Sequence, residues 1–581
     1  MLLGEVRASF GTGCGALALL ILTTPAFAQG APPLPTPEQI ERPRPDPART
    51  STVRIDSSGG IERQPCPLAD SDLILNVASI RFVTPSGEPL APEIAHSLQG
   101  ISAESGPRPI SVLCDLRDRA NAALRADGWV ASVQIPPQQI TGEEVRLVVV
   151  TAKIVELRIR GSAGPYQDLL RSRVEALRRM APLNERDAER LLLLTGDMPG
   201  LDIAMSLSPA GTAPGEVIGE LNVSFHRYAL LFNTQNYNSR LVGRETAYVG
   251  AEVYGLTGRG DVTYLGVSST YDLEEQIIVQ GGHVMTLNNA GTTLGARATY
   301  AWSRPDLGAL DYRTETIVGG LDLVHPLARS VGVDAAAYAG FDYIDQETKV
   351  YSGGAALPLT EDRLRVLFAG VEGEWREPDF GGWSHWSLRG NLELRKGLDI
   401  LDASEPGFTG GALQSRIDGD PTAWVLDWDV DGEVWPVAWL GLYGRTVGQW
   451  TDEALLNFEE FSLGNLSIGR GYDPGSNSAD RAVGTSSEIR VNLPIGPEAP
   501  FGAQVFGFYD RVWIDNLDPN STEVDRVLES YGAGVRLTMP GTALLEVTYA
   551  HPRDRALTID PRPPSDRVLI SLSFRYRDRA S

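Results

Sequence analysis

The chain has 581 residues, with 61 glycines, 39 prolines and a formal net charge of −24 at pH 7. This length predicts two to four domains, and the glycine and proline content predicts many turns. The negative charge argues against nucleic-acid binding, which needs a basic surface to displace counterions.

Residues 1–28 have the pattern of a secretory signal peptide. Arg7 supplies positive charge, residues 15–22 form an apolar core, and Ala26-Phe27-Ala28 is a small-x-small cleavage site. The apolar run is shorter than the ~20 residues that a membrane-spanning helix needs, which favours cleavage over anchoring. We therefore expect a secreted chain that begins near Gln29.

Residues 29–65 are expected to form a linker. Prolines occupy positions 32, 33, 35, 37, 43, 45 and 47. Each proline removes an amide donor and clashes with the preceding helical turn, so only about Pro37 to Arg42 can be helical. Extended chain is expected elsewhere in this segment.

Cysteine and histidine usage limits the chemistry of the mature chain. After loss of Cys14 with the signal peptide, Cys66 and Cys114 remain, an even number in an oxidising compartment. They form either a disulfide or two unpaired buried thiols. The six histidines are scattered singly, so neither zinc spacing nor a nucleophile constellation is present. We expect no metal, no cofactor and no catalytic residue, and hence no enzyme.

Residues 66–152 and 153–226 each predict a small α+β unit with the order β-α-α-β-β. The first unit is predicted to contain strands 73–83, 129–135 and 145–151 and helices 90–98 and 110–126. The second is predicted to contain strands 153–160, 201–208 and 217–225 and helices 166–180 and 184–195. Asn184 has the character of a helix N-cap.

From residue 227 to the end, apolar and polar residues alternate along successive segments. Three segments show the apolar row clearly: Trp424, Leu426, Trp428, Val430 and Val434; Trp386, Leu388, Leu392 and Leu394; and Val568, Ile570, Leu572, Phe574 and Tyr576. Apolar outside and polar inside is the rule of a transmembrane β-barrel, in which closure satisfies every backbone group. At about 22 residues per strand and connection, these 355 residues predict about 16 antiparallel strands around a water-filled lumen.

One arginine stands out in this region. Arg470 lies between Gly469 and Gly471 and precedes Tyr472. Flanking glycines let the backbone take tight conformations, so the sequence presents the arginine from a loop. An arginine inside a barrel keeps its proton and needs a carboxylate partner, because an uncompensated buried charge costs about 3–5 kcal/mol.

Taken in order, these segments resemble the two-partner secretion outer-membrane transporters, also called TpsB or haemolysin activation/secretion proteins. The two α+β units are similar to POTRA domains, periplasmic modules that bind unfolded clients. In that family, loop six folds into the lumen and carries a Val-Arg-Gly-Tyr/Phe motif, which Gly469 to Tyr472 matches with glycine in place of valine.

The resemblance also assigns partners to the loop arginine. The segment Phe506-Gly507-Phe508-Tyr509-Asp510 resembles the family's strand motif, and places Asp510 as the barrel-wall partner of Arg470. Glu488, in the segment 484–490, together with Phe506 and Phe508, is expected to support this pair. The family pattern implies that the arginine and Asp510 hold loop six in one position.

The implied function is non-enzymatic export of one large protein across the bacterial outer membrane. The POTRA units would bind an unfolded TpsA-like partner, whether adhesin, haemolysin or growth inhibitor, in the periplasm, and the barrel would pass it to the outside. Barrel-assembly machinery and outer-membrane lipid are the other expected partners.

An insertase of the same superfamily is the alternative function, although such a protein usually carries more than two POTRA units. A passive pore or ligand-gated receptor would lack these units or carry a plug domain of ~150 residues.

Overall fold

The computed structural model describes most of the chain after the predicted linker. The described residues are 35–40, 55–56, 66, 68, 71, 73–77 and 79–580, without 104–105, 140–143, 309, 378–384, 407, 410–411, 496–498, 500 and 520. The predicted signal peptide and most of the predicted linker therefore lie outside the described residues. None of the described helices is long and apolar enough to cross a membrane.

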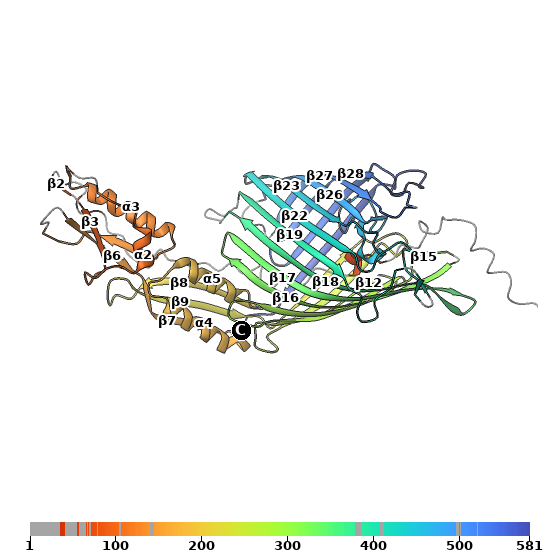
Figure 1. The fold of residues 1–581 in the computed structure, drawn as a ribbon, viewed down its shortest axis with the longest axis horizontal. Coiled ribbons are helices and arrows are strands. Elements are labelled where there is room, and N and C mark those ends of the chain that lie inside the picture. Colours follow the sequence, from red (N-terminus) through yellow and green to blue (C-terminus); the bar gives the residue numbers. More distant parts are fainter. Residues whose placement is uncertain are drawn as a thin grey trace, which may run out of the picture.

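The first α+β unit is a three-stranded sheet covered by two helices (Figure 1). In chain order it contains β3 (Ser79–Val83), α2 (Pro92–Ser97), α3 (Val112–Ala126), β5 (Ala131–Gln134) and β6 (Glu144–Thr151). The central strand β6 pairs in parallel with β3 and antiparallel with β5. Helix α3 buries its apolar stripe, including Leu116 and Leu124, against this sheet, as the spacing of its apolar residues predicts.

The predicted strand 73–83 is wrong as a single element. It is divided into β2 (Ile74–Asn76), which pairs with β4 (Pro107–Pro109), and β3, which belongs to the main sheet. Between them, Val77 is buried against Leu113 and Leu116 of α3, so the chain changes its pairing partner there. Strand β4 was not predicted, because two of its three residues are prolines, which lack an amide donor and are confined to sheet edges.

Cys66 and Cys114 are joined by a disulfide, with their Cα atoms 5.9 Å apart. This bond ties the beginning of the first unit to the first turn of α3. Of the two alternatives left open by the sequence, the structure therefore contains the bonded pair.

The second α+β unit repeats the same order of elements. It contains β7 (Lys153–Gly161), η2 (Gly164–Tyr166), α4 (Gln167–Arg179), α5 (Glu185–Gly196), β8 (Leu201–Pro209) and β9 (Glu216–Phe225). The side chain of Asn184 accepts a hydrogen bond from the Arg186 amide at 3.0 Å and caps α5. The sheet has the order β1-β8-β9-β7.

Strand β1 (Ile55–Asp56) comes from the part of the predicted linker that was expected to be extended chain. It pairs in parallel with β8, with Ile55 opposite Met205 and Asp56 opposite Ser206. The N-terminal segment thus occupies the β8 edge of the second sheet. A strand of two residues has too few positions to show alternation, so the sequence pattern gave no indication of it.

The rest of the chain forms a closed antiparallel barrel, which confirms the predicted barrel and its strand number. The described residues contain sixteen wall strands: β10 (Tyr228–Gln235), β11 (Thr246–Tyr254), β12 (Val262–Thr270), β13 (Gln276–Thr286), β14 (Thr293–Ser303), β16 (Leu310–Arg329), β17 (Val333–Ser352), β18 (Ala355–Arg376), β19 (Trp386–Gly397), β22 (Trp424–Val437), β23 (Leu440–Trp450), β26 (Arg481–Asn492), β27 (Gly502–Asp515), β28 (Arg526–Met539), β29 (Ala543–Pro552) and β30 (Arg567–Arg577). Pairing of β10 with β30 closes the ring.

Short strands accompany the wall at its connections: β15 (Asp306–Leu307), β20 (Phe408–Thr409), β21 (Ala412–Leu413), β24 (Phe461–Leu463) and β25 (Asn477–Ala479), with η3 (Asn457–Glu459) before β24. Strands β16, β17 and β18 have 20 to 22 residues, about twice the length expected for crossing a membrane. They extend beyond the remainder of the wall at the end far from the α+β units (Figure 1).

The outer surface of the barrel is apolar. Trp424 and Val434 of β22, Trp386 and Leu394 of β19, and Phe574 of β30 are exposed there, as the alternating pattern predicts. Such a belt is suited to lipid, whereas the polar residues between them face the lumen.

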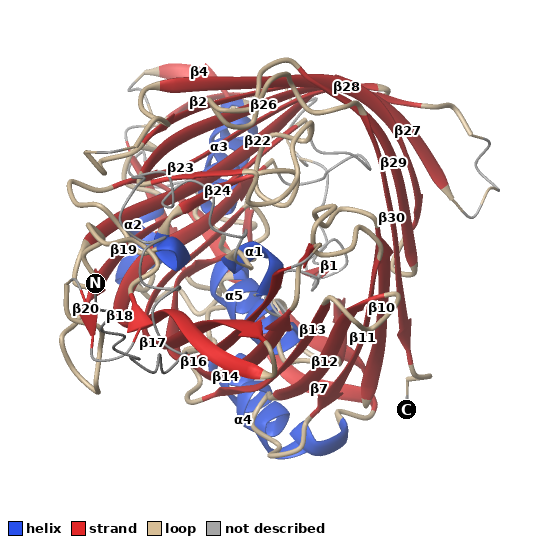
Figure 2. Ribbon diagram, turned by 90° about the vertical axis from the view of Figure 1, so that its right-hand side faces the viewer, coloured by secondary structure: helices blue, strands red, loops and turns tan. Residues whose placement is uncertain are grey.

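The lumen contains a short N-terminal element. Helix α1 (Pro37–Ile40) lies inside the ring of strands (Figure 2), within the window from Pro37 to Arg42 that the prolines leave free. Ile40 is buried against wall residues such as Ile344 and against Leu456 and Phe458 of the long connection between β23 and β26. A single helical turn of the N-terminal segment therefore occupies part of the lumen.

Candidate functional site

The long connection between β23 and β26, residues 451–480, folds back into the barrel. Phe461, Leu463 and Tyr472 of this connection form a buried cluster with wall residues including Val512 and Leu528. The hairpin β24–β25 closes its base. We call residues 451–480 the inner loop; it is the segment that the family resemblance designated loop six.

Arg470 projects from the inner loop into a set of polar wall residues. Its Nη2 lies 2.7 Å from Asp510 Oδ1, and its Nε donates to Asp510 Oδ2 at 3.0 Å, so the pair is bidentate. The backbone amide of Arg470 donates to Asp510 Oδ2 as well, at 3.0 Å. Nη2 also donates to Ser486 Oγ at 2.8 Å. The guanidinium and the amide of one residue thus converge on one carboxylate.

Glu488 and Phe508 complete the surroundings of the arginine. Glu488 Oε1 accepts from Arg470 Nη1 at 2.5 Å, and the guanidinium lies over the Phe508 ring, 3.6 Å from its centroid. Asp510 is 1 % exposed and Glu488 5 % exposed. Because both carboxylates are shielded from water, each needs cationic and hydrogen-bonding partners to remain ionised.

Glu488 belongs to a wider charge network on the lumen wall. Its Oε2 accepts from Arg490 Nε at 2.8 Å and from Arg536 Nη1 at 3.0 Å. Arg536 in turn pairs with Glu546 at 2.7 Å and lies over the ring of Phe506, 3.8 Å from its centroid. Strands β26, β27, β28 and β29 each contribute one or more of these residues, so the network around Arg470 extends over four adjacent wall strands.

The residues after Arg470 add a second attachment. The Tyr472 ring is fully buried, and its hydroxyl donates to the carbonyl of Glu529 at 2.9 Å. Arg567 Nη1 donates to the Tyr472 carbonyl at 2.6 Å, and its Nη2 lies 2.9 Å from Asp473 Oδ1. This anchor fixes the direction in which the loop leaves Arg470.

Two glycines permit the close approach of the inner loop to the barrel wall. Gly469 has φ +100°, a conformation that side chains with a Cβ rarely adopt. A Cβ on Gly471 would lie 2.8 Å from the Ser530 Cβ and 2.9 Å from Pro552 backbone atoms. Substitution at Gly471 would therefore push the loop away from the wall.

The structure thus brings together every residue that the sequence proposed for this site: Gly469, Arg470, Gly471, Tyr472, Glu488, Phe506, Phe508 and Asp510. Sequence reasoning missed Ser486, Ser530, Arg536 and Arg567. Each lies on an alternating strand, and alternation identifies an inward position without showing which inward residues meet an inserted loop. Among the described residues, no group of three or more His, Cys, Asp or Glu side chains is arranged to hold a metal ion.

Comparison with known proteins agrees with this architecture. The chain matches no protein-family model. It is 22% identical over 494 residues to the heme/hemopexin transporter protein HuxB of Haemophilus influenzae, covering 80% of this chain and 81% of HuxB.

Two solved structures share the fold. CdiB from Escherichia coli superposes with a TM-score of 0.68 at 14% identity, covering 88% of this chain and 93% of CdiB. CdiB from Acinetobacter baumannii superposes with a TM-score of 0.61 at 15% identity, covering 90% and 92% of the two chains. The two structures confirm the fold, and the likeness to HuxB agrees with the resemblance to two-partner secretion outer-membrane transporters that the sequence motifs indicated.

Proposed function

We propose that this chain is the outer-membrane translocator of a two-partner secretion system, which exports one unfolded partner protein through its barrel. The observation that carries the proposal is the bidentate pair of Arg470 and Asp510, formed by a loop folded into the lumen of a sixteen-stranded barrel. This motif lies downstream of two successive β-α-α-β-β units. Both features are expected of a TpsB protein.

In this proposal the chain is divided as the sequence predicts. Residues 1–28 are a signal peptide, 29–65 a linker, 66–152 and 153–226 two periplasmic POTRA domains, and 227–581 the transmembrane barrel. The order of strands and helices in the two N-terminal units supports the POTRA assignment, because the two units share one plan and the second joins β10 directly.

The POTRA units would receive the partner by strand addition to a sheet edge. Two edges are already engaged: β1 pairs with β8, and the Val133 amide of β5 donates to Asn121 Oδ1 at 2.8 Å. In the described part of the chain, β3 and β7 each have a single neighbouring strand in the main sheets. We therefore assign partner binding to the edges of β3 and β7.

The inner loop would act as the gate. Its attachment to the wall defines one closed position, and a passing chain needs that loop and α1 to move. Export would draw its free energy from folding of the partner outside the cell, because an ATP-binding motif is absent from the sequence.

The test is secretion of the partner's N-terminal fragment by cells that carry the wild-type chain, Arg470→Ala or no copy. We expect export to the medium with the wild type and its loss with Arg470→Ala, while the barrel still assembles and shows heat-dependent migration in gels. Arg389→Ala is the matched control, because Arg389 pairs with Asp431 on the wall and, among the described residues, forms no ion pair with the inner loop.

Unchanged secretion by Arg470→Ala would refute the gating role. Depletion of other outer-membrane proteins in cells without the chain, together with periplasmic retention of the fragment in all strains, would refute the exporter and support the insertase.

A further inference from the structure

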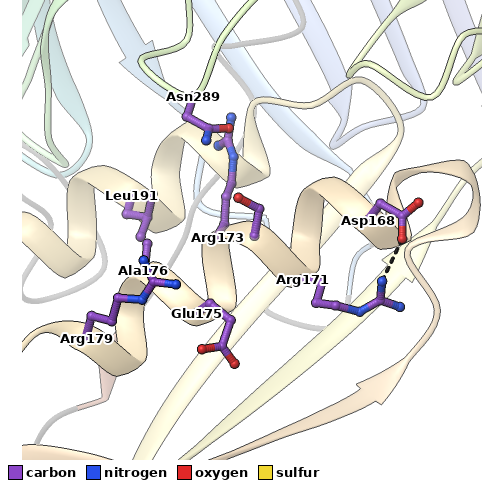
Figure 3. Close-up of a pocket in the computed structure, with 9 residues that line it drawn as sticks. Asp168, Arg171, Arg173, Glu175, Ala176, Arg179, Leu191 and Asn289 are labelled. Atoms are coloured by element: carbon purple, nitrogen blue, oxygen red, sulfur yellow. Dashed lines mark hydrogen bonds and ion pairs between the residues drawn. The ribbon is translucent and has the colours of Figure 1, made fainter.

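A cavity of about 480 Å³ lies where the second α+β unit meets the barrel. Helix α4 contributes Arg171, Arg173 and Arg179 to its lining, α5 contributes Leu191, and the connection between β13 and β14 contributes Asn289 (Figure 3). The cavity is separate from the inner loop and from the lumen network.

Arg173 is the unusual member of this lining. It is 2 % exposed, and its Nη1 donates to Thr195 Oγ1 at 3.2 Å. Its Nε and Nη2 are buried and have no hydrogen-bond partner among the described residues. Burial lowers the pKa of the guanidinium to about 10, opposed by the negative charge of Asp197, so Arg173 remains protonated at neutral pH. Two donors of a buried cation are thus available to an acceptor that the protein does not supply.

Asp168 and Glu175 line the cavity beside the arginines, and Asp197 lies near Arg173; each of these carboxylates is paired with an arginine. Three such pairs are present: Asp197 with Arg329 at 2.7 Å, Asp168 with Arg171 at 2.7 Å and Glu175 with Arg178 at 3.0 Å. In the part of the chain that the structure describes, neither Arg173 nor Arg179 forms an ion pair within 4.0 Å. Three arginines against two carboxylates leave the lining with one net positive charge, and the buried arginine without a carboxylate partner is Arg173.

The surroundings indicate what kind of anion would bind. Leu287, at the start of the β13–β14 connection, is 43% exposed, and Leu327, near the end of β16, is 58% exposed. Leu287 belongs to the same connection as Asn289 of the lining, and Leu327 follows Pro326, on which Gly291 of that connection packs. Gly291 packs so closely on Leu194 of α5 and on Pro326 that a Cβ there would lie 2.7 and 3.0 Å from them. Cationic donors beside a lipid-facing apolar surface fit a phosphate that carries acyl chains.

We propose that this cavity binds the phosphate group of a phospholipid from the adjacent leaflet. Arg173 donates to the phosphate through Nε and Nη2, and Arg179 and Arg171 contact it at the mouth. The acyl chains lie along the exposed leucines of the barrel. The bound lipid links α4 and α5 to the membrane and so restrains the orientation of the second unit.

The experiment is native mass spectrometry of the full, delipidated chain titrated with phosphatidylglycerol. We expect one lipid per chain whose affinity falls by about tenfold or more in Arg173→Met, because charge-assisted donors are lost. Arg158→Met, on β7, where Arg158 pairs with Glu156 outside the cavity lining, is the control and should bind as the wild type does. Arg173→Lys should restore part of the affinity.

Arg171→Gln combined with Arg179→Gln removes the two exposed arginines and leaves the core of α4 intact, so it decides the question if Arg173→Met fails to fold. Equal lipid binding by this variant and the wild type would overturn the proposal. Inorganic phosphate that displaces the lipid at an equal concentration would also overturn it, by identifying the cavity as a site for soluble anions.

Discussion

Arg470 is suited to its place by the geometry of its side chain as much as by its charge. Its guanidinium donates to Asp510, Glu488 and Ser486 in one plane, while its flat face lies on the ring of Phe508. A lysine would provide the charge from a single ammonium on a flexible stem, without the planar fork.

Arg470→Lys should therefore fail to hold the inner loop, although the charge is conserved. Each charge-assisted hydrogen bond contributes about 1.5–3 kcal/mol, and lysine cannot form all of those that arginine forms here. We expect export of the partner to fall by about tenfold or more, with greater cleavage of the inner loop by protease added outside cells. Arg389→Lys should leave both measurements unchanged, and export at the wild-type level by Arg470→Lys would show that charge alone suffices.

For single residues, the sequence identified members of the site only where the neighbouring residues formed an unusual motif. The sequence Gly-Arg-Gly-Tyr identified Arg470, and its family motif led to Asp510; Arg259, the other arginine between glycines in this region, is not followed by an aromatic residue at that place. Arg567 has the same role of holding the loop, through the Tyr472 carbonyl, yet it is the first residue of an ordinary β-strand and no local signal distinguishes it. Contacts between an inserted loop and a wall depend on the barrel register, which alternation does not determine.

Among the elements, the first α+β unit is small and depends on its disulfide. Its sheet has three strands, and the Cys66–Cys114 bond closes a segment with a sequence separation of 48 residues. Cross-linking a segment of this length restricts the unfolded chain and typically stabilises a small secreted domain by about 2–5 kcal/mol.

Replacement of both cysteines by serine should destabilise this unit without affecting the barrel. We expect the first unit to unfold at a lower temperature and to be cleaved faster by protease in the purified full chain, while the barrel keeps its heat-dependent migration. Addition of a reductant to the wild type should reproduce the effect. Equal protease resistance of oxidised and reduced chains would show that the core around Leu116 and Leu124 suffices alone.

Helices whose apolar residues recur at a regular spacing were predicted better than short strands that form only by pairing with another strand. Helices α3 and α5 each carry an apolar stripe, and α5 an N-cap, and both fell within two residues of their predicted bounds. Strands β1 and β4 exist only because β8 and β2 pair with them. A tertiary partner of this kind is invisible to a local pattern.

At the scale of the whole molecule, the chain places its own N-terminal segment at two successive positions. Residues 35–40 lie in the barrel lumen, and residues 55–56 pair with the second sheet. The sequence predicted neither position, since prolines restrict helix formation but do not say where an extended chain is bound.

This arrangement predicts that the N-terminal segment limits the open area of the pore. Ile40 is fully buried between the wall and the inner loop residues Leu456 and Phe458, so its removal also loosens the loop. Replacement of residues 35–40 by six glycine and serine residues keeps the length of the chain but removes these contacts. In planar lipid bilayers we expect higher single-channel conductance and more frequent openings than for the wild type.

Two variants separate the contribution of α1 from that of the inner loop. Arg470→Ala alone should increase gating fluctuations while α1 remains in the lumen, and its combination with the glycine-serine replacement should give the widest pore, because both obstacles are then released. Arg389→Ala, which removes the wall ion pair with Asp431, should conduct as the wild type does. If the replacement leaves conductance unchanged, the inner loop by itself closes the lumen, and α1 serves only to hold the N-terminal segment in place.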